Sequence, residues 1–169
     1  MSASKLLLSL FEYKAWANEE LLAALGRVDA AAHADTVQAA TRLLNHISVV
    51  DRIFAAHLRG REHGFDATNT DATPSLAELT ETVRATDRGY VDFLKSATAQ
   101  ALTEVIAFTF TDGLRGRMTR EEMLAHVLTH GNYHRGSVGR MLSEIGIKPP
   151  RDSVTVFLHA TQPERRAPG

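Results

Sequence analysis

Apolar residues recur at intervals of three and four positions along most of the chain, which is the spacing of amphipathic helices. Gly26, Gly60 and Gly146 follow apolar stretches of this kind, and glycine commonly ends a helix. Thr119 and Glu122 have the spacing of a capping box, which marks a helix start. The pattern predicts an all-α fold with four long helices, over residues 4–25, 36–59, 76–95 and 119–145.

The segments between these helices are polar or rich in turn-forming residues. Residues 61–75 are rich in Asp, Thr and Gly and predict a loop. Residues 104–110 carry β-branched and aromatic side chains before Thr111-Asp112-Gly113, which predicts a short hairpin or an extended linker. Residues 153–159 predict a short final helix and residues 162–169 a frayed tail. No repeat or change of composition divides the chain, so we expect a single domain over residues 1–169.

Composition narrows the classes of function. Of the 169 residues, 44% are hydrophobic and 23% are charged, as in globular proteins. The 19 Lys and Arg nearly balance the 20 Asp and Glu, so no overall positive charge favours a nucleic-acid partner. The longest stretch without Asp, Glu, Lys or Arg, from Met123 to His134, is far shorter than the about 20 apolar residues of a membrane span. We therefore expect neither a nucleic-acid nor a membrane partner.

Two further features concern location and metal ligands. The apolar run of residues 6–11 lacks the cleavage site of a secretory signal, so we expect a cytoplasmic protein. The chain has no cysteine, which agrees with that compartment and excludes a disulfide or a thiolate metal site. Any bound metal ion must be held by histidines and carboxylates.

The eight histidines include a pair that points to a metal site. His130 and His134 fall in the apolar stripe of the predicted fourth long helix, one turn apart, where two imidazoles can face one ion. On the second helix His46 and His57 both lie near the apolar side, but eleven residues, about 16 Å, separate them, so only one can join the pair. His126 lies at the edge of the stripe. Alternatively, each of these histidines is a core residue with ordinary hydrogen-bond partners.

Known metalloenzyme motifs are missing around this pair. No histidine belongs to a His-Glu-x-x-His motif, and none has a glutamate three residues earlier, as di-iron bundles require. On its own, the His-x-x-x-His spacing therefore leaves both the site and its reaction open.

The region around the pair resembles the DinB/YfiT-like family of metal-binding four-helix-bundle proteins, and the resemblance covers nearly the whole chain. Its most specific part is the segment LAHVLTHGNYHRG at residues 124–136, followed by Gly146 and Pro149-Pro150. Supporting pieces are Trp16-Ala17-Asn18, Leu43-Leu44-Asn45-His46 and Asp51-Arg52. The resemblance implies that His46 joins His130 and His134 as a metal triad. It also implies an up-down-down-up bundle and a homodimer.

A three-histidine site with an open position suits Zn²⁺ or Ni²⁺ and can activate water or a thiol. In the family, characterised branches use low-molecular-weight thiols. The leading hypothesis is therefore a metal-dependent hydrolase or thiol transferase acting on a small molecule, with any thiol supplied by a cofactor or substrate. The alternative is a non-enzymatic metal-binding or stress-response homodimer with structural histidines. DNA binding is a third class, which the net charge of −1 does not favour.

Several other residues are candidates for a pocket. Tyr13 and Trp16 could line one or could simply pack in the core. Tyr133 could donate a proton or lie at a rim. Arg135 and Arg140 could bind an anion, although helix arginines are usually solvated. Asn45 and Asp51 point away from the His46 side of an ideal helix, so neither is expected to be a ligand.

Overall fold

The computed structural model describes residues 3–166, which form a helical bundle with one small hairpin. The long helices are α1 (Ala3–Gly26), α2 (Ala34–His57), α3 (Leu76–Ser96) and α5 (Arg120–Glu144). The short elements are α4 (Ala99–Thr103), β1 (Val105–Thr109), β2 (Arg115–Thr119), α6 (Val154–Thr161) and the 3₁₀ turn η1 (Pro163–Arg165). The predicted all-α class is confirmed, and each predicted long helix is present.

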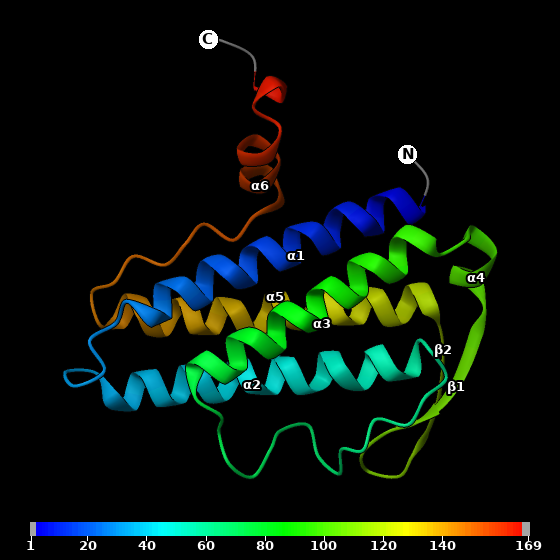
Figure 1. Cartoon of the computed structure of the whole chain (residues 1–169), viewed down its shortest axis with the longest axis horizontal. Coiled ribbons are helices and arrows are strands. Elements are labelled where there is room, and N and C mark those ends of the chain that lie inside the picture. The colour runs from blue at the N-terminus through cyan, green and yellow to red at the C-terminus, as the bar shows by residue number, and fades with distance from the viewer. Residues whose placement is uncertain (1–2, 167–169) are drawn as a thin grey trace.

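The four long helices lie side by side, and the chain direction can be followed by colour in Figure 1. α1 packs against α3 and α5, and α2 packs against the same two helices. α1 and α5 run one way, while α2 and α3 run the other. The predicted loop over residues 61–75 brings the chain back along the bundle between α2 and α3. This arrangement agrees with the order that the resemblance implies.

Side-chain caps fix where two of the long helices begin. The hydroxyl of Thr119 accepts a hydrogen bond from the Glu122 backbone N–H, and the Glu122 carboxylate accepts one from the Thr119 N–H. Ser75 and Glu78 form the same reciprocal pair at the start of α3. Each box satisfies backbone donors that the first helical turn leaves free. The capping box predicted at Thr119 is confirmed.

Residues 104–119 form the predicted hairpin, with β1 and β2 paired antiparallel. Its turn is closed by the Phe110 N–H, which donates to the Leu114 carbonyl at 2.8 Å. Gly113 has a φ of 85°, a conformation that favours glycine. At Gly116, a Cβ would come within 2.7 Å of the Phe108 and Phe110 rings, so a larger residue there would force these rings to shift.

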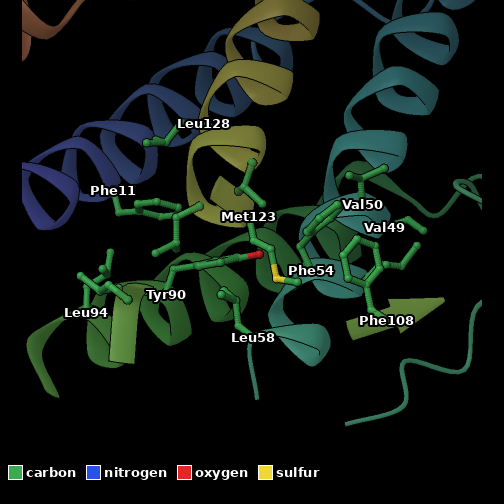
Figure 2. Packing of buried hydrophobic residues seen from close by; sticks show 14 residues of the cluster. Phe11, Val49, Val50, Phe54, Leu58, Tyr90, Leu94, Phe108, Met123 and Leu128 are labelled. Atoms are coloured by element: carbon green, nitrogen blue, oxygen red, sulfur yellow. The ribbon is translucent and has the colours of Figure 1, made fainter. Parts of the chain in front are cut away.

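Apolar side chains from all the long helices and from β1 meet near the hairpin end of the bundle. Figure 2 shows this cluster, in which Phe11, Phe54, Tyr90, Phe108 and Met123 surround one interior. The rings of Phe11 and Tyr90 stack with centroids 4.8 Å apart. A second apolar cluster, built from α1, α2, α3 and α5, fills the other end. The layer between these two clusters contains polar side chains.

The C-terminal segment lies outside the four-helix core, and Figure 1 shows α6 standing out beside α1. Phe157 of α6 packs against Tyr13 and Trp16 of α1, with ring centroids 6.1 and 5.9 Å apart. The predicted short final helix is confirmed. The predicted frayed tail is wrong for residues 163–165, because they form the 3₁₀ turn η1, and residues 167–169 lie outside the described part. α4, only five residues long, was not predicted.

Candidate metal centre

Three histidines from two neighbouring helices lie together between α2 and α5. His46 comes from α2, and His130 and His134 come from successive turns of α5. One ligand atom of each lies within 4.8 Å of the others. The Nε2 atoms of His46 and His130 are 3.0 Å apart, and the centroid of the His134 ring is 4.5 Å from that of His130. Within residues 3–166, no other group of three histidines or carboxylates is this compact.

The loop between α2 and α3 orients the His46 ring. Its Nδ1 lies 2.7 Å from the carbonyl oxygen of Thr68, which can only accept, so Nδ1 carries the proton. A neutral His46 ring then has its lone pair on Nε2, the atom that faces His130. Asn45, the neighbour of His46, donates to Asn69 Oδ1 and Thr70 Oγ1 and so anchors the same loop. Ligating histidines in metalloproteins typically donate their second N–H in this way.

His130 has a buried ring nitrogen, Nδ1, that lacks a hydrogen-bond partner among the described residues. Burial, and then the neighbouring His134 and His46, lower the pKa of His130 to about 3. Burial and His46 also lower the pKa of His134. Both rings are therefore neutral near pH 7, which is the form that binds metal.

The donor set fits a divalent transition-metal ion. Zinc–nitrogen bonds of 2.0–2.1 Å in a tetrahedron separate two ligand nitrogens by about 3.3 Å, close to the 3.0 Å between His46 and His130. The three ligand atoms together lie within 4.8 Å of one another, so small side-chain shifts would bring all three to bonding distance of one ion. Without an ion, the two Nε2 atoms can share one hydrogen bond, donated by His130. That arrangement still leaves the buried Nδ1 of His130 without a partner. Three neutral imidazoles fill three positions of a four-coordinate ion and leave one open.

The other two candidate histidines lie outside this cluster. His57 sits near the hairpin, with its ring 4.7 Å from that of Phe108 and 5.1 Å from that of His63. His126 stacks between Phe54 and His130, one turn before the pair on α5. Of the two α2 candidates, the structure thus brings His46, and not His57, to the pair.

The three predicted pocket residues lie in two different places: Tyr13 and Trp16 pack against α6, and Tyr133 lies beside the histidine cluster. Tyr13 is buried, packs against Phe157 and donates its hydroxyl to Asp152. Burial, and then Asp152, raise its pKa to about 12. Trp16 also packs against Phe157, and it lines a cavity of about 310 Å³. Tyr133 is 75% exposed, and its ring lies beside that of His134.

The expectation that helix arginines are solvated is wrong for Arg135. Arg140 does lie at the surface, where it pairs with Glu144. Arg135 is only 2% exposed. Its Nε donates to Asp152 Oδ2 at 2.8 Å, and its two Nη atoms donate to Asn18 and Asn132. A buried guanidinium is stable only when its donors are used, as they are here.

A second buried ion cluster, which the sequence analysis missed, lies in the same layer of the bundle. Lys14 of α1 is fully buried, with its Nζ 2.7 Å from Asp51 Oδ2 and 2.6 Å from Asp87 Oδ1. Burial acts to lower the pKa of Lys14, but the two carboxylates outweigh it and raise that pKa. Asn18 donates to Asp87 and accepts from Arg135, so it joins both ion clusters into one network.

The spacing of these charged residues could have revealed them. Each of Lys14, Asp51, Asp87 and Arg135 follows an apolar or small residue by four positions and precedes another by three. They therefore occupy positions of the apolar stripe, where a charge must be paired. Asn45 and Asp51 are not in the histidine cluster, as predicted, but both are buried. The stripes are Leu10-Lys14-Ala17, Ile47-Asp51-Phe54, Val83-Asp87-Tyr90 and Gly131-Arg135-Val138.

None of the helices described between residues 3 and 166 combines the length and apolarity that a bilayer span requires.

Comparisons with known proteins agree with this architecture. The family model for the DinB family matches residues 1–166. Protein DinB of Bacillus subtilis (strain 168) is 23% identical over 168 aligned residues, which cover 92% of this chain and 95% of that protein. No solved structure gives a significant match. Since the family model spans nearly the whole chain, the protein belongs to the DinB family.

Proposed function

We propose that His46, His130 and His134 hold one divalent metal ion, and that the protein is a metal-dependent enzyme. The observation that carries this proposal is the meeting of three imidazole ligand atoms within 4.8 Å of one another. Membership of the DinB family is compatible with metal binding. We favour Zn²⁺ or Ni²⁺, because imidazole ligands suit both ions.

The proposed reaction is hydrolysis or thiol transfer on a small-molecule substrate. A divalent ion with three neutral ligands keeps its charge and lowers the pKa of water or of a thiol at its open position. The chain has no cysteine, so a thiol would come from a low-molecular-weight cofactor or from the substrate. Thr68 holds the His46 ring in the tautomer that the site needs. Tyr133, exposed beside His134, is our candidate for a residue at the rim of the site.

Metal analysis of untagged protein tests the binding step. We expect about one Zn²⁺ or Ni²⁺ ion per chain in the wild type and almost none in His130→Ala. His159→Ala removes an exposed histidine of α6 and is the matched control, which should keep its ion. A folded wild type that stays metal-free after incubation with both ions would contradict the proposal.

Activity assays then separate an enzyme from a metal-binding protein. The metal-loaded wild type should turn over a member of a panel of esters, amides and thiol acceptors, and His130→Ala should not. Stoichiometric metal binding without turnover on any member would favour the non-enzymatic alternative. The homodimer, the single domain and the cytoplasmic location stay predictions.

A further inference from the structure

A cavity of about 310 Å³ lies between α1, the second half of α5 and residues 149–152. Trp16 on α1 and Pro149 and Pro150 on the C-terminal segment are among its walls. None of the three clustered histidines lines it. The volume is at the lower end of the range for cavities that bind small molecules. It is large enough for one ring with a short side chain.

Two glycines of α5, Gly136 and Gly139, line this cavity. Glycine within a helix costs about 1 kcal/mol relative to alanine, so its presence calls for a reason. At Gly139 a Cβ would make only an ordinary contact with Pro149 Cβ, at 3.4 Å. Gly136 has no packing reason either, because a Cβ there would meet no atom within 4 Å. Since Gly136 lines the cavity, a larger side chain at this position would occupy space that the cavity now contains.

Two arginines at the cavity have donors that an anion can use. Three arginines and two carboxylates line it, and Glu144 beside Arg140 balances the third arginine, so any preference for an anion rests on these donors and not on net charge. Arg135 and Asp152 are already paired with each other. Arg140 uses its Nε for Glu144 and keeps further donors, since a guanidinium has five. Arg151 is exposed and makes no ion pair with a described residue.

We propose that this cavity is a second binding site, for a small apolar carboxylate. Its ring or alkyl group would lie against Trp16 and the two prolines, and its carboxylate would meet Arg140 and Arg151. The site would work without the metal ion, because its walls and its charges belong to residues outside the histidine cluster.

Tryptophan fluorescence tests the proposal on the full-length protein. Trp16 is the only tryptophan, so its emission reports directly on this cavity. We expect a saturable change on titration with 3-phenylpropionate. The neutral 3-phenylpropanamide has the same ring and should bind at least about fivefold more weakly, the effect of one exposed ion pair. The cationic 3-phenylpropylamine should not bind.

Variants locate the site. Gly136→Leu fills the cavity and should weaken binding of 3-phenylpropionate more than tenfold, while circular dichroism shows an unchanged helical fold. The double variant Arg140→Gln/Arg151→Gln should bind about fivefold more weakly than the wild type. Arg117→Gln removes an exposed arginine of β2 outside the cavity and is the matched control, with wild-type binding expected.

The result is independent of the metal centre. His130→Ala and treatment with a chelator should leave the binding of 3-phenylpropionate unchanged, so failure of the metal proposal would not affect this one. Equal binding of the amide or the amine would overturn the proposal. So would wild-type binding by folded Gly136→Leu, or the absence of any saturable change.

Discussion

Two groups of polar side chains lie within the same bundle, and they differ in how their charges and hydrogen-bond donors are used. The buried ion network has fully buried Lys14 between two carboxylates, and Arg135 uses donors on an aspartate and two asparagines. The histidine cluster is half-buried, and His130 leaves a buried nitrogen without a partner. A network whose charges are paired and whose donors are used stabilises one packing arrangement, even though one acceptor, Asp51 Oδ1, has no partner among the described residues. Three neutral imidazoles that converge on one point are suited to a ligand instead. We therefore regard the ion network as structural and the histidine cluster as the candidate site.

The largest expected effect comes from removing Lys14, which tests whether the buried ion network stabilises the fold. Lys14→Ala leaves Asp51 and Asp87 buried without their shared cation, so the free energy of unfolding should fall by about 4 kcal/mol. Urea denaturation followed by circular dichroism measures this change. Arg84→Ala breaks an exposed pair with Glu19 and should lower the free energy of unfolding much less than Lys14→Ala does. Equal losses in the two variants would show that the buried network does not stabilise the fold.

Asp51 gives a pH-dependent test of the same network. Burial, which outweighs the attraction of Lys14, raises the pKa of Asp51 from 3.8 to about 6. The folded protein then binds this proton more tightly than the unfolded chain does. The added stability is complete below pH 3.8 and is lost as the pH rises through about 6.

The comparison of the wild type with Asp51→Asn isolates this contribution from that of the histidines. The free energy of unfolding of the wild type, minus that of the variant, should fall by about 2 kcal/mol between about pH 4 and about pH 7. Urea titrations at a series of pH values measure the difference. A difference that does not change with pH would mean that Asp51 is ionised throughout.

The smallest expected effect concerns the histidine cluster without metal. In metal-free protein, His130→Ala should change the free energy of unfolding by less than about 1 kcal/mol, because the half-buried ring makes one hydrogen bond and leaves one nitrogen unsatisfied. Thermal and urea denaturation in the presence of a chelator measure it. A loss of several kcal/mol would show that the imidazoles, like the buried ion network, stabilise the fold.

The sequence predicted the parts of this fold that depend on periodicity and local caps. The four long helices, the capping box at Thr119 and the short helix after Pro150 follow from local patterns. The His130 and His134 pair followed from helical spacing. Choosing His46 over His57 needed the resemblance, because both lie on the same side of α2 and only the packing of α2 on α5 decides between them.

The buried charges were harder to predict, because pairing across helices is a tertiary property. Arg135 looks like a solvated helix arginine until Asn18, from the first helix, and Asp152, from the segment after α5, are brought beside it. The spacing of Lys14 and Asp87 in apolar stripes was available, but it does not say which charges meet. The orienting contact from Thr68 to His46 depends on the path of a long loop, which periodicity does not describe.

Anomalous X-ray scattering from crystals of the untagged, metal-loaded protein tests the central claim most directly. We predict one peak at the absorption edge of the bound metal, about 2.0–2.1 Å from a nitrogen of each of His46, His130 and His134. A fully loaded protein with its ion on other residues would contradict the account. The same holds if any one of the three imidazoles lies beyond bonding distance of the ion.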